Sequence, residues 1–282
     1  MPRYAYRIVN VFADSASPQN RLSGNPLCVF EDARGLDTLA MQALALQFNL
    51  SESVFVWPSD QATARIRIFT TAFEMPFAGH PTLGSAHVVR ALNGTGDQVT
   101  LETGAGVIAV KARGDEWTLK ANPPQSRLYA RTMESLAQTL GINANDISDA
   151  PLWVNTGNEQ LVVPLASADA VRRCRPDAVR MAAEKADTPK IYVWADVGGG
   201  ELFARFFLLK HGALAEDHGT GSAAANLGGW HVARNTPLPV KCVIRQGEVI
   251  SRPSRLLLDV DVAGGIYVGG QVIELGAGSL TI

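Results

Sequence analysis

Residues 64–84 read ARIRIFTTAFEMPFAGHPTLG, and this stretch decides the fold. At its start two arginines alternate with two isoleucines, a period of two that predicts a half-buried strand over residues 64–69. A loop then leads to Gly79 and His80, where a run of small and apolar residues predicts a helix over residues 80–92. The stretch is therefore expected to fold as a strand, a loop and a helix.

A second stretch follows the same plan: residues 202–224 read LFARFFLLKHGALAEDHGTGSAA. An offset of 142 residues separates Glu74 from Glu216, and the same offset separates Gly79 from Gly221. A constant offset between matching features indicates an internal repeat. We therefore interpret the chain as a duplication of one strand–loop–helix unit.

Strands outnumber helices among the predicted elements of both halves. In the second half we expect a helix over residues 176–186 and a loop over residues 210–219. Asn122-Pro123-Pro124 interrupts the strand pattern, as prolines do between elements. The expected domains are an N-terminal lobe of residues 1–124 and a C-terminal lobe of residues 125–282, whose last strand could return to the first lobe.

Composition limits the classes of partner. Lys and Arg total 25 against 27 for Asp and Glu, so the net charge is −2 and offers no basic surface for nucleic acid or an anionic membrane. The hydrophobic fraction of 46% is enough to bury a core. A small-molecule partner is therefore expected, with no nucleic acid and no membrane.

The three cysteines, Cys28, Cys174 and Cys242, are widely spaced and form no Cys-x-x-Cys pair. An odd number without such a motif favours neither a disulfide framework nor a zinc site. The first residues carry mixed charge and lack the apolar run of a signal peptide. We expect unpaired cysteines outside the active site and a cytoplasmic protein.

The predicted helix starts at Gly79-His80 and Gly221-Ser222 are candidate anion sites. The first amides of a helix have no intrahelical partner, and the helix dipole adds partial positive charge there. Each dipole contributes only about 0.3–1 kcal/mol when exposed, so side chains must supply the remaining affinity. The alternative is that these glycines only permit close helix packing.

Three side chains near these starts could carry acid–base chemistry. Glu52 lies where a predicted helix passes into an apolar strand, a place where a carboxylate is usually solvated and inert. His80 lies at a helix start, where the dipole favours the neutral imidazole. Asp217 precedes the second start, and its alternative role is that of a helix N-cap.

Two other motifs are poor matches to their families. Gly219–Ala224 fits G-x-G-x-x-A, but it follows a loop of about ten residues rather than the tight strand-to-helix turn of a dinucleotide site. His80 and His87 are two helical turns apart and have no accompanying ligand cluster. We expect neither a metal nor an organic cofactor.

Several stretches together resemble the PhzF family of phenazine-biosynthesis-like isomerases, which are relatives of diaminopimelate epimerase. The main matches are Leu50–Ser53 with Glu52, Phe77–Gly84 (FAGHPTLG), and Glu216–Ala223 (EDHGTGSA). Supporting matches are Gly24–Pro26, Thr156-Gly157, Arg205-Phe206, Gln246-Gly247 and Arg252-Pro253, in order along the whole chain. The chain departs from the family at His218, where proline is usual after the aspartate.

The resemblance implies an α+β fold of two similar lobes, each a curved, barrel-like mixed sheet around a central helix. It implies cofactor-independent proton transfer in the cleft between the lobes, with Glu52 carrying the proton and His80 and Asp217 as the other catalytic candidates. Ser51, Gly79, Gly221 and Ser222 are the substrate-binding candidates. We also expect a homodimer.

The expected function is isomerisation of a small carboxylate-bearing, possibly cyclic, metabolite. One alternative is a catalytically idle member of the fold that binds a ligand or a protein. Another is an epimerase of an amino acid or hydroxy acid. The epimerase relatives carry two cysteines at the helix starts, whereas this chain has His80 and Ser222 there, which argues against a two-thiol mechanism.

Overall fold

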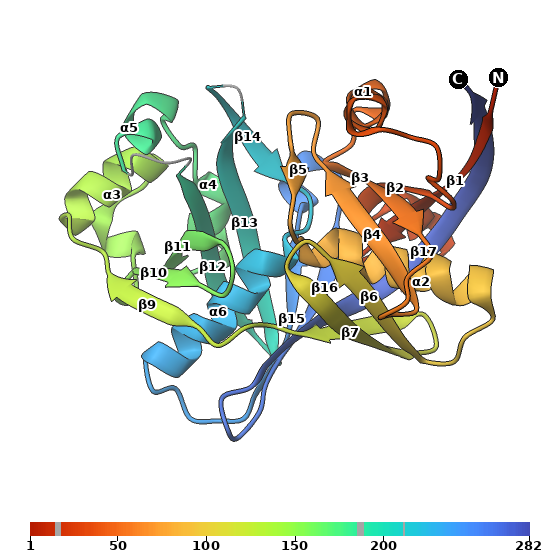
Figure 1. The fold of residues 1–282 in the computed structure, drawn as a ribbon. Coiled ribbons are helices and arrows are strands. Elements are labelled where there is room, and N and C mark those ends of the chain that lie inside the picture. Colours follow the sequence, from red (N-terminus) through yellow and green to blue (C-terminus); the bar gives the residue numbers. More distant parts are fainter. Residues whose placement is uncertain (15–17, 185–188, 211) are drawn as a thin grey trace. The chain divides into compact units, whose positions relative to one another are not determined.

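The computed structural model in Figure 1 describes residues 1–14, 18–184, 189–210 and 212–282. The chain divides into two compact units. Unit 1 consists of Met1–Lys120 and Gly269–Ile282, and unit 2 of Ala121–Val268. The C-terminal segment therefore belongs to the same unit as the N-terminus.

The described residues of unit 1 form eight longer strands, one short strand and three helical segments. Its strands are β1 (Arg3–Val11), β2 (Asn25–Phe30), β3 (Glu52–Trp57), β4 (Ala64–Phe69), β5 (Glu74–Met75), β6 (Gln98–Thr103), β7 (Gly106–Arg113), β8 (Glu116–Lys120) and, from Gly269 onward, β17 (Ile266–Thr281). Its helices are η1 (Pro18–Leu22), α1 (Thr38–Phe48) and α2 (Gly79–Asn93).

The strands of unit 1 pair into a closed ring. The order is β17–β1–β2–β3–β4–β6–β7–β8, and β8 pairs in turn with β17. The β2–β3 and β4–β6 pairs are parallel, so the sheet is mixed. Closure gives each strand in this order a paired neighbour on both sides, and the β4–β6 pairing involves only Ala64 and Arg65 of β4.

Helix α2 lies inside this ring. It contacts β1, β2, β3, β4, β6, β7 and β8, and nine of its residues are buried. Small residues permit this position: a Cβ added to Gly84 would lie 2.6 Å from Leu27 and 2.9 Å from Val11. On the outer face α1 covers an aromatic cluster that includes Phe30, Phe55 and Phe69.

Unit 2 has the same plan. Its strands are β9 (Gln125–Leu128), β10 (Leu152–Asn155), β11 (Glu159–Pro164), β12 (Lys190–Gly198), β13 (Glu201–Lys210), β14 (Ala213–Asp217), β15 (Val240–Gln246), β16 (Ser254–Val260) and the first residues of β17. Its helices are α3 (Met133–Leu140), η2 (Ala144–Asp146), α4 (Ala168–Arg173), α5 (Ala178–Ala182), α6 (Gly221–Ala233) and η3 (Glu248–Ile250).

The strand pairing of the two units repeats element by element. The run β9–β10–β11–β12–β13–β15–β16 matches β17–β1–β2–β3–β4–β6–β7, with parallel pairs at the same two places. Helix α6 takes the place of α2 and contacts β9, β10, β11, β15 and β16. In Figure 1 α3, α4 and α5 lie on the opposite face of the unit 2 sheet. The predicted α+β fold of two similar barrel-like lobes is confirmed, and so is the duplication.

One sequence prediction of local structure is wrong, and a second is confirmed only over part of its length, with its residues 185–186 outside the described ranges. The expected loop over residues 210–219 contains β14, which forms an antiparallel hairpin with β13. Its short sequence lacks a clear period of two, so only the partner strand shows it to be a strand. The expected helix over 176–186 is confined among the described residues to α5, capped by Asp177, and α4 precedes it as a separate helix.

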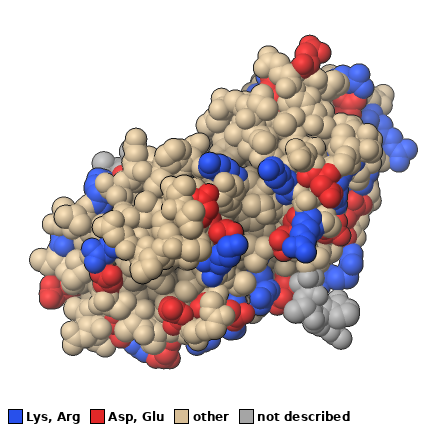
Figure 2. Space-filling view, turned by 90° about the horizontal axis from the view of Figure 1, so that it is seen from below, with Lys and Arg blue, Asp and Glu red and all other residues tan. Residues whose placement is uncertain are grey.

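The surface agrees with the charge balance of the sequence. Figure 2 shows acidic and basic side chains interspersed on the face in view, without a broad area of one sign. No helix in the described ranges is long and apolar enough to cross a membrane.

Candidate active site

Glu52 and His80 meet in unit 1. Glu52 is the first residue of β3 and His80 the second of α2. The His80 Nδ1 lies 3.0 Å from the Glu52 Oε2, and the side chains are 6% and 18% exposed. The alternative of a solvated Glu52 is therefore wrong, because this side chain is mostly buried and bonded to an imidazole, and its catalytic role remains a prediction.

The second ring nitrogen of His80 contacts a backbone carbonyl group, which fixes the position of one proton on the imidazole. The Nε2 lies 3.2 Å from the backbone carbonyl oxygen of Asn25, which can only accept, so Nε2 carries a hydrogen. The contact between Nδ1 and Glu52 then needs one further proton, either on the imidazole or on the carboxyl group. The contact therefore joins an imidazole and a carboxyl group, the two side-chain types used most often for acid–base chemistry, through one hydrogen bond.

A tight turn places the Asn25 carbonyl. Gly24 has φ +81°, and a Cβ there would lie 2.6 Å from the Val11 carbonyl oxygen, so only glycine fits. Phe12 also has positive φ, at 61°, and its buried ring lies 6.4 Å from the His80 ring. Strained backbone of this kind concentrates at functional sites.

The start of α2 is open. Its N-cap residue Ala78 forms no side-chain cap, and a Cβ added to Gly79 would meet nothing within 4 Å. The alternative that Gly79 serves only close packing is therefore wrong. Ser51, directly before β3, is half-buried. The site in unit 1 thus combines a hydrogen-bonded carboxyl–imidazole pair with a helix start that has no side-chain cap.

Asp217, Gly221 and Ser222 lie together in unit 2 at the start of α6. The Thr220 hydroxyl donates to the Asp217 Oδ2 at 2.6 Å. Asp217 is thus not the N-cap of α6, since Thr220 holds that position and forms no side-chain cap. The two sets of predicted residues occupy different units, and their joint action remains a prediction.

Gln246, at the end of β15, holds this turn. Its Nε2 donates to the Asp217 carbonyl oxygen and to the Thr220 hydroxyl, both at 3.0 Å, and its Oε1 accepts from the Thr220 amide at 3.3 Å. Because its amide group contacts backbone groups of fixed polarity, its orientation is determined. The Thr220 oxygen accepts from Gln246 and therefore gives its own proton to Asp217.

The unusual His218 is accommodated by a glycine. A Cβ at Gly247 would lie 2.5 Å from the His218 carbonyl oxygen and 2.2 Å from that of Arg252. In unit 1 the same approach occurs between Gly104 and Pro76. The repeat thus holds proline at one of these places and histidine at the other, with the same backbone packing.

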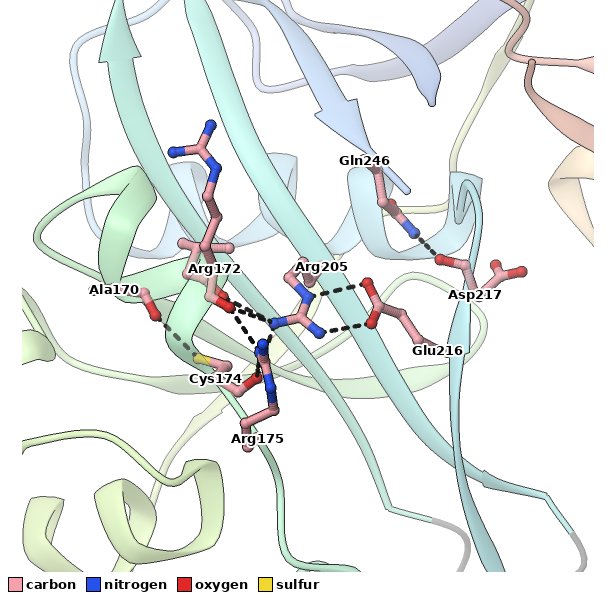
Figure 3. A network of polar contacts seen from close by, with 9 residues as sticks. Ala170, Arg172, Cys174, Arg175, Arg205, Glu216, Asp217 and Gln246 are labelled. Atoms are coloured by element: carbon pink, nitrogen blue, oxygen red, sulfur yellow. Dashed lines mark hydrogen bonds and ion pairs between the residues drawn. The ribbon is translucent and has the colours of Figure 1, made fainter. Parts of the chain in front are cut away.

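Arg205 and Glu216 form a buried ion pair next to Asp217 that the sequence did not identify as part of the site (Figure 3). Arg205 Nη2 donates to Glu216 Oε2 at 2.7 Å and Nε to Oε1 at 3.0 Å. Arg205 Nη1 also donates to the carbonyl oxygens of Val171 and Cys174. The pair therefore ties β14, which carries Asp217, to the end of α4. The recurrence of an arginine and a glutamate in both repeats was the available signal.

The cysteines and possible metal ligands lie apart from this chemistry. Cys28, Cys174 and Cys242 are unpaired, as predicted. Burial raises the pKa of the Cys28 thiol, and it raises the pKa values of Cys174 and Cys242 to about 12, so all three are poor nucleophiles. Among the described residues, no three His, Cys, Asp or Glu side chains are placed to hold a metal ion.

Comparison with known proteins identifies the family. The model of the phenazine biosynthesis-like proteins matches residues 9–275. The chain is 39% identical to an uncharacterized isomerase of Pasteurella multocida (99% of this chain, 94% of that one), and 34% identical to trans-2,3-dihydro-3-hydroxyanthranilate isomerase of Pseudomonas aeruginosa (93% and 92%). The crystal structure of a PhzF-family phenazine biosynthesis protein from Bacillus anthracis superposes with a TM-score of 0.85 at 23% identity, covering 100% of both chains. The chain therefore belongs to the phenazine biosynthesis-like (PhzF) family and is an isomerase.

Proposed function

We propose that this isomerase moves a proton within a small carboxylate-bearing metabolite without a cofactor, with Glu52 as the proton carrier. The observation that supports this most directly is the 3.0 Å contact between His80 Nδ1 and Glu52 Oε2, with His80 Nε2 at the Asn25 carbonyl oxygen. Glu52 can take a proton from one carbon and return it to another, while His80 keeps the carboxyl group correctly oriented.

The second half of the proposal concerns unit 2. We assign Asp217 a catalytic role on the same substrate, and Gly221 and Ser222 a role in binding its carboxylate together with Ser51 and Gly79. The uncapped starts of α2 and α6 support this assignment, because both leave backbone amides for an anion. The hydrogen bond from the Thr220 hydroxyl orients the Asp217 carboxylate, which supports a catalytic role for Asp217.

The relatives suggest the substrate class. The Pseudomonas aeruginosa relative is named for isomerisation of trans-2,3-dihydro-3-hydroxyanthranilate, a cyclic carboxylate. We propose that this chain acts on the same class of small cyclic carboxylates, and that compound is the first one to assay. We also propose a homodimer in the cytoplasm, a reducing compartment that suits three unpaired cysteines.

The experiment compares wild type with Glu52→Gln, which removes the titrating group and conserves shape. Substrate turnover in heavy water is followed by deuterium incorporation into the product. Loss of the general acid–base group should lower turnover by about 100-fold to 10,000-fold and alter substrate binding far less. Undiminished deuterium incorporation in Glu52→Gln would show that another base moves the proton.

A matched control is Glu102→Gln, which neutralises a carboxylate of unit 1 with a side-chain exposure of 27%. It should retain wild-type turnover.

The stereochemistry of the product distinguishes the proposed isomerase from the epimerase alternative. An epimerase returns a diastereomer or enantiomer of its substrate rather than a double-bond isomer.

A further inference from the structure

Ser222 is connected to a chain of buried amide side chains in unit 2. The Gln160 Nε2 lies 2.9 Å from the Ser222 Oγ, and the Asn226 Nδ2 lies 2.9 Å from the Gln160 Oε1. Gln160 and Asn226 are both fully buried, whereas Ser222 is partly exposed. The chain therefore leads from the interior to the start of α6.

Backbone groups fix the orientation of the first amide in this chain. The Thr156 backbone amide donates to the Asn226 Oδ1 at 2.9 Å, and the Asn226 Nδ2 donates to the Asn158 carbonyl oxygen at 2.8 Å. A backbone N–H can only donate and a carbonyl can only accept. The Asn226 amide group thus has one permitted orientation, with its oxygen toward Thr156.

The orientation of the Asn226 amide group determines that of the Gln160 amide group. Because Asn226 presents an N–H to Gln160, the facing atom must be the Gln160 oxygen, and the Gln160 N–H must face Ser222. The Ser222 oxygen accepts this hydrogen, so the Ser222 hydroxyl proton is left to donate elsewhere. Gln160 has no other role in the site described above, and its full burial makes an unsatisfied amide costly.

We propose that Gln160 is a positioning residue that leaves the Ser222 hydroxyl proton free to donate, so that the subsite at the start of α6 prefers a carboxylate to a group that presents only donors. The inference rests on the proposed function in one respect: Ser222 is taken to contact the substrate. Gln160 itself does not touch the substrate and acts through Ser222.

The test uses benzoate, a carboxylate, and benzamidine, which has a similar shape but presents only donors. Affinities are measured by calorimetry at one salt concentration. Wild type should bind benzoate more tightly. Gln160→Glu places an acceptor beside Ser222 and draws its proton away, so benzoate affinity should fall about tenfold or more and benzamidine should gain relative to it.

A double-mutant cycle separates this effect from simple charge repulsion. In a Ser222→Ala background, Gln160→Glu should weaken benzoate binding by less than about threefold, because the hydroxyl that transmits the change is absent. Gln160→Met, without a charge, should give a smaller loss than Gln160→Glu. Gln42→Glu is the matched control: Gln42 donates to the Thr70 carbonyl in unit 1, and its replacement should leave benzoate affinity unchanged.

Three results would overturn the proposal: no benzoate binding by wild type, an equal loss in both Ser222 backgrounds, or no change in the preference between the two probes. A neutron structure of the deuterated wild-type protein provides a test that needs no variant. It should show deuterium on the Gln160 nitrogen facing Ser222, and deuterium on Ser222 between the two residues would refute the assignment. None of these measurements requires turnover, so they are independent of the Glu52→Gln exchange experiment.

Discussion

The two units carry the same arginine–glutamate pair on equivalent hairpins, yet in different surroundings. In unit 1 Arg67 on β4 pairs with Glu74 on β5, and in unit 2 Arg205 on β13 pairs with Glu216 on β14. Each guanidinium also lies over a phenylalanine two residues further on, Phe69 or Phe207. The side chains are 23% and 38% exposed in unit 1 but only 5% and 10% in unit 2.

The two ion pairs differ in exposure because their arginines contact different helices. The helix is α4, between β11 and β12, in unit 2, and α1, between β2 and β3, in unit 1. Arg205 donates to the carbonyl oxygens of Val171 and Cys174 at the end of α4, and the Val171 oxygen also accepts from the Cys174 amide. Arg67 instead reaches the Thr38 hydroxyl at the start of α1. Identical side-chain pairs thus serve as a surface contact in one repeat and as a buried junction next to Asp217 in the other.

The largest effect is expected from Arg205→Met. It leaves the Glu216 charge and the α4 carbonyls buried without their partner, so the free energy of unfolding should fall by about 3–5 kcal/mol. Urea unfolding at pH 7 measures this. A loss below about 1 kcal/mol would mean that the buried pair behaves like its exposed counterpart, and the comparison would fail.

The pH dependence of stability should also be larger for a buried histidine of unit 2 than for one of unit 1. Burial next to Trp194 and Trp230 lowers the pKa of His231 in unit 2 to about 4, against an opposing effect of Asp196. Burial also lowers the pKa of His87 in unit 1, against an opposing effect of Asp115. The unfolded state binds the proton more readily than the folded state, so the stabilisation is complete above about pH 6.5 and is lost as the pH falls toward 4.

His231→Phe removes this titration. Between pH 7 and pH 4 wild type should lose about 3 kcal/mol more stability than the variant. His87→Phe, measured in parallel, should give a smaller difference of the same sign. Equal slopes for wild type and His231→Phe would show that His231 is protonated in the folded protein.

The smallest effect is expected from Arg67→Met. Exposed ion pairs contribute about 0–1 kcal/mol and are screened by salt. Urea unfolding at low and high salt should give a change within that range, and smaller at high salt. A loss of unfolding free energy as large as that of Arg205→Met would mean that the exposed ion pair stabilises the protein as much as the buried one.

The sequence predicted the repeated architecture because the repeat is local: a strand with period two, a glycine at a helix start and a small-residue helix. The strand over Ala64–Phe69 has the predicted bounds. Strand β14 was missed because its hydrogen bonds come from β13, and its five residues carry no pattern of their own. Glu52, His80 and Asp217 were chosen through family resemblance, and only the first two have been brought together by the structure.

Burial of Arg205 and the polarity of Ser222 could not be predicted from the sequence. Arg67 and Arg205 have similar neighbours along the chain, and the difference arises from α4, about thirty residues upstream of Arg205. The direction of the Ser222 hydroxyl depends on Asn226 and on the Thr156 amide, which is distant in sequence. Such properties belong to long-range packing rather than to local patterns.

Because most of strand β17 belongs to unit 1, the unit whose synthesis begins first is completed after unit 2. Unit 1 needs Gly269–Ile282 to pair with β1 and β8, so its ring cannot close until these residues have left the ribosome. Unit 2 has all its residues by Val268. The half synthesised second can therefore assemble first, and the N-terminal half, in which β1 has only β2 as its partner until then, is the part that a nascent chain must protect from aggregation.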